Sequence, residues 1–159
     1  DVFVENALSE DAINAIYSQA KISKLNIKNS VSDAIDLDYS DAEIENLKLE
    51  NNKGDGLDIS GSLVKCSYCV FVNNKDKGVS IGEMSNFYAR NSSFSQNDMG
   101  LANKDQSVLN LSNSKLINNR IAIAEFIKKP YFGKPKSYLN KNYYLENGSK
   151  YEWLGLYSY

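Results

Sequence analysis

The segment Asp33-Ala34-Ile35-Asp36-Leu37-Asp38 decides the fold of this chain, because it returns at a constant interval. Its copies each begin 22 residues after the one before, at 55–60 (DGLDIS), 77–82 (KGVSIG) and 99–104 (MGLANK). A weaker copy begins at Ile121 and a degenerate one at Asp11. A fixed period of this length indicates a repeat architecture in which each unit stacks on its neighbours. The chain therefore contains about six equivalent units.

Each unit carries short strands with one buried face. Apolar residues alternate within the first segment, at Ile35 and Leu37, and a second alternating pair follows at Leu47 and Leu49. Alternation with a period of two is typical of a strand buried on one side. Stacking such units places equivalent residues about 4.8 Å apart in parallel sheets and closes a continuous core. This pattern predicts an all-β, right-handed parallel β-helix of about six 22-residue rungs.

Asparagine pairs such as Asn51-Asn52 and Asn73-Asn74 precede the glycine of the next copy. Asparagine tolerates left-handed backbone geometry at turns, and stacked asparagines can bond the turn carbonyls. A leucine-rich repeat is less consistent with the chain, because its leucine spacing is not sustained and no segment has helical periodicity. A calcium-binding nonapeptide roll is disfavoured because its glycine-aspartate motif is absent.

The chain length of 159 residues suits one domain. The rungs are predicted over residues 1–133. Residues 134–159 lose the repeat and contain many tyrosines and the single tryptophan, Trp153. Because the end of a β-helix exposes unpaired strand edges, this aromatic stretch is predicted to be an irregular C-terminal cap of the same domain.

The apolar-x-apolar pattern followed by NN-x-x-x-G-apolar resembles the right-handed parallel β-helix repeats of carbohydrate-binding and sugar-hydrolysis domains. Residues 33–104 look most like bacterial β-helices that accompany spore-coat-H-type kinase and lamin-tail modules in large exported proteins. The resemblance covers residues 22–133. It implies an extracellular or cell-envelope location and flanking modules, and it brings no catalytic motif.

Composition excludes several classes of function. The chain has 18 basic and 20 acidic residues and no basic block, so nucleic acid is not an expected partner. It has no apolar run long enough for a transmembrane helix. It also lacks histidine, which excludes Ser-His and Cys-His catalysis and histidine-held metals.

Acidic residues gather on one predicted face. Because Ile35 and Leu37 point inward, Asp36 and Asp38 point outward, and Asp58 lies one rung above Asp36. Residues 31–60 contain nine carboxylates and two lysines. This face has three interpretations: Asp36, Asp38 and Asp58 are catalytic carboxylates of a glycosidase, they hold Ca²⁺, or they form a solvated surface.

Other side chains are candidates for ligand contact. Lys77 lies in register with the acidic repeat positions and could act as the base of a lyase. A sugar-stacking platform could include the outward aromatic residues Tyr39, Tyr68, Phe87 and Tyr88. The two cysteines, Cys66 and Cys69, occupy apolar core positions, which favours buried thiols over a disulfide.

These observations predict a non-catalytic exported scaffold or carbohydrate-interaction module that presents an acidic outer face. The alternative is a polysaccharide-active enzyme, a hydrolase or lyase on uronic-acid polymers, that uses the aspartate cluster with or without calcium. A polysaccharide or glycan is the expected partner in both cases.

Overall fold

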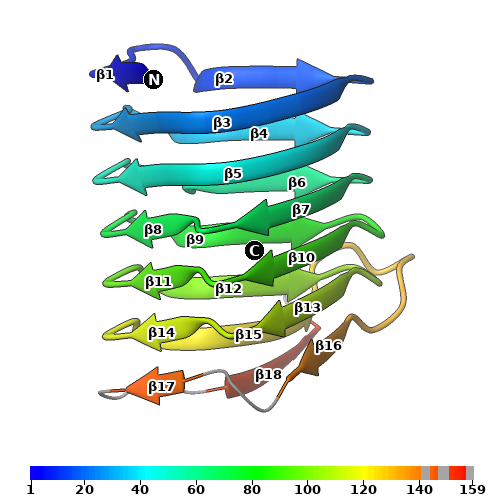
Figure 1. Ribbon diagram of the computed structural model, residues 1–159. Helices are drawn as coiled ribbons and strands as arrows, with labels where there is room; N and C mark the ends of the chain where they lie inside the picture. Colours follow the sequence, from blue (N-terminus) through cyan, green and yellow to red (C-terminus); the bar gives the residue numbers. More distant parts are fainter. Residues whose placement is uncertain (141–143, 147–150, 157–159) are drawn as a thin grey trace.

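The computed structural model describes residues 1–140, 144–146 and 151–156. These residues form a right-handed solenoid of β-strands without any helix (Figure 1). Consequently, no helix within the described ranges has the length and hydropathy to cross a bilayer. Successive turns stack along one axis, and every strand pair is parallel.

One wall of the solenoid is a seven-stranded sheet. Its strands follow chain order, with one strand from each turn. They are β2 (Asp11–Ile16), β4 (Asp33–Asp38), β6 (Leu57–Ser60), β9 (Lys77–Gly82), β12 (Met99–Lys104), β15 (Ile121–Ile127) and β18 (Tyr151–Leu156). The repeated segments of the sequence are therefore the strands of this sheet.

The rest of the wall is an eleven-stranded bent sheet with two arms. The first arm consists of residues 19–23 of β3 (Gln19–Lys28), residues 41–45 of β5 (Asp41–Glu50), β7 (Leu63–Ser67), β10 (Asn86–Arg90), β13 (Val108–Ser112) and β16 (Lys136–Leu139). The second arm consists of β1 (Val2–Glu5), the later residues of β3 and β5, β8 (Val70–Val72), β11 (Ser93–Ser95), β14 (Lys115–Ile117) and β17 (Tyr144–Glu146). Each turn thus contributes to three faces.

Apolar side chains line up in files inside the solenoid. Ile35 pairs in register with Leu57, which pairs with Val79, and the file continues through Leu101 to Ile123. All five side chains are fully buried. On the second arm, Phe71 stacks on Phe94 with ring centroids 5.0 Å apart. The predicted alignment of equivalent positions is confirmed.

The chain turns at three corners in each rung, and residues with left-handed backbone geometry occupy them. Corner 1 leads from the seven-stranded sheet to the first arm, corner 2 joins the two arms, and corner 3 returns to the seven-stranded sheet. The left-handed residues are Tyr17, Tyr39, Gly61, Glu83, Met84, Asp105 and Gln106 at corner 1; Lys24, Asn46, Tyr68, Asn91 and Asn113 at corner 2; and Asn6, Asn29, Asn51, Asn73, Gln96 and Asn118 at corner 3. Asparagine dominates corner 3 because it adopts this geometry at low cost.

Buried polar ladders stabilise the corners. At corner 3, the side-chain amide of Asn74 donates to the Asn97 side-chain oxygen at 3.1 Å and to the Leu49 carbonyl at 3.3 Å. Asn52 donates to Asn74 in the same way at 2.8 Å. The neighbouring glycine leaves room for this ladder, since a Cβ on Gly78 would lie 3.1 Å from the Asn97 side-chain nitrogen and 2.5 Å from the Gly100 carbonyl oxygen. The predicted asparagine ladder is confirmed.

The repeat contains one compensated insertion. The seven-stranded sheet keeps a spacing of 22 residues, as in the pairing of Val79 with Leu101. The serine ladder at corner 1 instead steps by 23 residues from Ser62 to Ser85. The asparagine ladder at corner 3 also steps by 23, from Asn74 to Asn97. The turn that contains Ser85 therefore has one additional residue at corner 1 and one residue fewer after corner 3. The spacing of the seven-stranded sheet is thereby kept at 22 residues.

The aromatic C-terminal stretch extends the sheets. β16 pairs with β13, β17 with β14, and β18 with β15. Pairing of β15 with β18 shifts register between Glu125 and Phe126, where the regular repeat is interrupted. The stretch predicted as an irregular cap therefore includes three strands in parallel register with the last regular turn.

Candidate functional site

The acidic residues predicted to share a face do lie together on the outside of the seven-stranded sheet. Asp36 pairs in register with Asp58, and Asp38 lies two residues further along β4. The Asn14 side-chain amide donates to the Asp36 carboxylate at 3.2 Å and to the Asp11 carboxylate at 3.1 Å. The face therefore holds stacked carboxylates with few cations among them.

A buried ion pair lies at the corner-3 side of this face. The Lys77 ammonium is 3.3 Å from the Asp55 carboxylate, and each side chain is 8% exposed. It also contacts Asp76 at 2.5 Å. The backbone N–H of Lys77 donates to Asp55 at 2.9 Å, and the N–H of Asp55 donates to Asp33 at 2.6 Å. The Lys77 ammonium is thus already ion-paired with the carboxylates of Asp55 and Asp76.

The environment raises the pKa of several of these carboxyl groups. Burial, together with the charges of Asp38 and Asp58, raises the pKa of Asp36 to about 7. Burial also raises the pKa of Asp55 to about 7, although Lys77 opposes the shift. Burial is the main cause of the raised pKa of Asp33 as well. A carboxyl group with a pKa near 7 can accept or donate a proton at neutral pH.

These shifts predict that the domain loses stability as pH rises. Asp36 keeps its proton in the folded state up to about pH 7, whereas the unfolded chain releases it near 3.8. The folded state therefore binds more protons in that window, and the free energy of unfolding falls across it. Thermal unfolding is expected to give a higher melting temperature at about pH 5 than at about pH 8.

The variant Asp36→Asn is the direct check of this pH dependence. It is expected to flatten the profile and to raise the melting temperature on the alkaline side, because it removes a half-buried negative charge. The exposed Asp41, changed to Asn, is the matched control and is expected to leave the profile unchanged. A wild-type stability that stays level or increases with pH through this window would contradict the prediction.

The carboxylates that could share a cation differ in part from those predicted. Asp33, Asp55 and Asp58 each offer an oxygen, and these oxygens lie within 4.8 Å of one another. One Asp58 oxygen is buried and has no hydrogen-bond partner among the described residues. Asp36 and Asp38 are not in this group, and Lys77 already supplies a positive charge beside Asp55. Asp58 is the residue that this group shares with the predicted set of Asp36, Asp38 and Asp58. Calcium binding stays a prediction.

The acidic face covers only the first turns of the sheet. On β9, β12 and β15 the equivalent outward positions are buried, beginning with Ser80. Met99, Ala102, Ile121, Ala124 and Phe126 form a second apolar cluster there, with Leu154 packed against it. Lys104 is also buried and donates to the Ser80 hydroxyl at 2.7 Å. The half-buried outward aspartates therefore lie on β2, β4 and β6, and the half-buried Glu152 on β18 is separated from them by this apolar cluster.

A groove lies on a different face, along the outside of the first arm. It has a volume of about 640 Å³ and crosses successive turns of the solenoid. Its lining includes the outward side chains of Lys21, Glu43, Lys65, Tyr88, Arg90 and Asn110. Arg90 donates to the Ser67 hydroxyl at 2.8 Å, which holds its guanidinium over the groove wall. This groove was not predicted from the sequence. Its lining contains Lys21, Glu43 and Lys65, which alternate in charge and pair in register on neighbouring turns.

The predicted ligand-contact residues are dispersed. Tyr88 lines the groove and is 41% exposed. Tyr39 lies at corner 1, where it stacks on Tyr17 with ring centroids 5.2 Å apart, and Tyr68 is exposed at corner 2. Phe87 is fully buried in the core, because it faces inward in the file of Val64 and Leu109. Its assignment to a sugar platform was therefore wrong.

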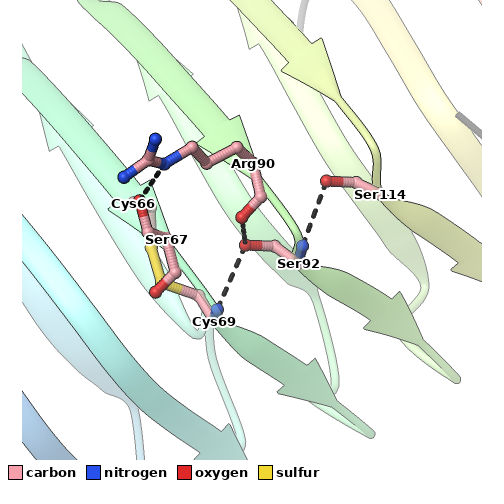
Figure 2. The surroundings of a disulfide bond; sticks show 6 residues. All are labelled: Cys66, Ser67, Cys69, Arg90, Ser92 and Ser114. Atoms are coloured by element: carbon pink, nitrogen blue, oxygen red, sulfur yellow. Dashed lines mark hydrogen bonds between the residues drawn. A yellow bond between two sulfur atoms is a disulfide. The ribbon is translucent and has the colours of Figure 1, made fainter. Parts of the chain in front are cut away.

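The two cysteines form a disulfide across corner 2. Both sulfur atoms lie in the core positions predicted from the repeat, but Cys66 and Cys69 are bonded and not free thiols. Figure 2 shows the bond beside the serine ladder, where the Cys69 N–H donates to the Ser92 hydroxyl at 3.1 Å. The turn at Tyr68 brings the cysteines together, which the apolar pattern alone did not reveal.

Fold and family agree. The parallel strands, the three corners and the internal ladders define a parallel β-solenoid. The family described as right handed beta helix region matches residues 11–149, and the chain belongs to this family. Membership supports a carbohydrate-related β-helix domain and is compatible with both binding and catalysis. No curated protein and no solved structure matches the chain.

Proposed function

We propose that the chain is a carbohydrate-binding domain and that a polysaccharide lies in the groove along the first arm. The observation that carries the proposal is the groove itself, which is open, about 640 Å³ in volume and lined by side chains from successive turns. Charged, hydroxyl and amide groups can bond sugar hydroxyls, and the Tyr88 ring offers an apolar surface for a sugar face. The family membership supports the same class of ligand.

Tyr88→Ala is the variant that tests the groove. We expect it to weaken polysaccharide binding about tenfold, because the ring contributes stacking area at the centre of the lining. Binding is measured by calorimetry against a panel of acidic and neutral polysaccharides. Tyr68→Ala is the matched control, because Tyr68 is also exposed but is not among the groove-lining residues.

Two results would contradict the proposal. One is the absence of binding to every polysaccharide in the panel by the folded wild-type domain. The other is a loss of affinity in Tyr68→Ala with none in Tyr88→Ala, which would place the ligand at corner 2. Repeating the titrations with Ca²⁺ and with a chelator tests the predicted dependence on calcium.

Polysaccharide hydrolysis or cleavage by a lyase is the second candidate function. It is favoured by the pKa of Asp36 near 7, which provides a proton donor beside the Asp58 carboxylate. Product release from uronic-acid polymers that is lost in Asp36→Asn together with Asp58→Asn would support this function. Turnover that persists in that variant would exclude these carboxylates as the catalytic groups.

An extracellular or cell-envelope location is part of the proposal. The Cys66–Cys69 disulfide supports it, because disulfides persist mainly in oxidising compartments. The flanking spore-coat-H-type kinase and lamin-tail modules stay a prediction from the resemblance.

A further inference from the structure

Arg90 is a cation of the groove lining that is held in place and still has free donors. Its Nε donates to the Ser67 hydroxyl at 2.8 Å. Ser67 lies between Cys66 and Cys69 in the chain, and the disulfide closes this corner around it (Figure 2). The two terminal nitrogens of the guanidinium have no hydrogen-bond or ion-pair partner within the part of the chain that the structure describes. A planar guanidinium that is already positioned loses little side-chain freedom when it binds a matching group.

Two further side chains complete a positively charged part of the groove. Tyr88 lies two residues before Arg90 on β10, so both side chains point outward on the same face. Lys65 pairs in register with Tyr88 on the preceding turn. Its ammonium lies 3.9 Å from the Glu43 carboxylate, and both side chains are more than half exposed, so this ion pair is weak. On the other side of Arg90, the groove-lining residues of β13 are uncharged.

The groove becomes negative on β5. Glu43 and Glu45 line it there, and Glu45 belongs to the outward file that continues through Ser67 to Arg90. Two turns separate Glu45 from Arg90, which corresponds to about 10 Å between equivalent backbone positions. Lys21 on β3 is the remaining charged residue of the lining among the described residues, and it pairs in register with Glu43. The sign of the charge therefore changes twice along the axis of the solenoid.

We propose that the ligand of the groove is a polysaccharide with isolated carboxylated sugars in an otherwise uncharged chain, and that Arg90 binds one of these carboxylates. This inference rests on the proposed function. The two oxygens of a carboxylate match the two terminal nitrogens of the guanidinium, and Lys65 adds a second positive charge beside them. The Tyr88 ring offers its apolar surface to the same sugar.

The carboxylates of β5 determine why the acidic sugars must be isolated. A sugar chain that runs along the solenoid axis from Arg90 also passes Glu43 and Glu45. A second ligand carboxylate at this place would be repelled, whereas the hydroxyl groups of an uncharged sugar can donate to both glutamates. A polymer with a carboxylate on every sugar is therefore disfavoured, and so is one with none.

A graded series of one polymer tests the proposal. The carboxylated polysaccharide that binds best in the panel is prepared with all of its carboxylates free, with part of them converted to methyl esters, and with all of them converted. Calorimetry on the wild-type domain is expected to give the partly esterified form a Kd about tenfold below that of either other form.

Variants assign the preference to particular residues. Arg90→Gln is expected to abolish the advantage of the partly esterified form over the fully esterified one, because the carboxylate loses its partner. Glu45→Gln is expected to raise the affinity for the form with all carboxylates free about fivefold, because a like charge is removed. Lys53→Gln removes an exposed cation outside the groove lining and is the matched control. Circular dichroism checks that each variant is folded.

Equal affinity for the three forms overturns the proposal, as does tightest binding of the fully charged or the fully esterified form. An unchanged preference in folded Arg90→Gln also overturns it. If Arg90→Gln does not fold, the wild-type series and Glu45→Gln still decide. Binding of polysaccharides without carboxylates alone would refute this inference and leave the proposed function standing. Absence of binding to every polysaccharide would refute both.

Discussion

Replacing Lys77 by methionine is expected to destabilise the domain by about 3–5 kcal/mol and to lower its melting temperature by roughly 10 °C. Methionine keeps most of the side-chain volume and removes the charge. The Asp55 carboxylate, which is 8% exposed, then lacks the cation that offsets its burial. Because burial already raises the pKa of Asp55 to about 7, this group can take up a proton instead. The loss is therefore expected to be smaller at about pH 5 than at about pH 8.

The controls for this prediction lie within the same cluster. Lys75 is exposed and two residues away, so Lys75→Met is expected to change stability by less than about 0.5 kcal/mol. The double variant Lys77→Met with Asp55→Asn is expected to recover most of the loss, since it removes both buried charges. Chemical denaturation gives the free energies of unfolding. Equal losses in the single and double variants would show that Lys77 acts through packing alone.

Replacing Asn74 by alanine is expected to cost about 3 kcal/mol, because it interrupts a buried ladder in both directions. Asn74 accepts a hydrogen bond from the Asn52 amide at 2.8 Å and donates to the Leu49 carbonyl at 3.3 Å. Alanine removes the acceptor of the buried Asn52 amide and one donor to the Leu49 carbonyl. The desolvation of the buried Asn52 amide is the main part of the cost.

Asn73 provides the matched control for the ladder. It precedes Asn74 and donates to Asn51, but this bond is exposed. Its φ of 54° suits glycine, so Asn73→Gly is expected to change stability by less than about 1 kcal/mol. Comparison of the two variants by chemical denaturation separates the buried ladder from the turn geometry. An equal effect at both positions would contradict the explanation.

The repeat in the sequence was sufficient to predict most of the fold. Alternation at Ile35 and Leu37 and the constant interval fixed the strands, the parallel stacking and the inward file. The asparagine pairs also predicted the ladder at corner 3. These features depend on local pattern and on stacking of equivalent positions, and both are visible in a single sequence.

The remaining features depend on contacts that the repeat does not encode. The disulfide requires the left-handed turn at Tyr68, whereas the apolar pattern predicted two buried thiols. Phe87 was wrongly predicted to face outward, because the repeat at 33–38 does not fix the register of the first arm. The groove is lined by side chains of five neighbouring strands, β3, β5, β7, β10 and β13, and neither composition nor spacing describes such a surface. Lys77 was recognised at the correct register, but its burial beside Asp55 of the preceding turn and Asp76 was not predicted.

The compensated insertion shows where this scaffold accepts additional sequence. A residue gained at corner 1 is balanced at corner 3, so the neighbouring strands keep their alignment. Residues 128–135 connect β15 to β16 at the same corner, and the sheets continue beyond them. Corner 1 also separates the acidic surface from the groove. Variation of loop length there can consequently alter the rim of both surfaces while the framework beneath them stays unchanged, which makes this edge the natural place for grafting new specificity.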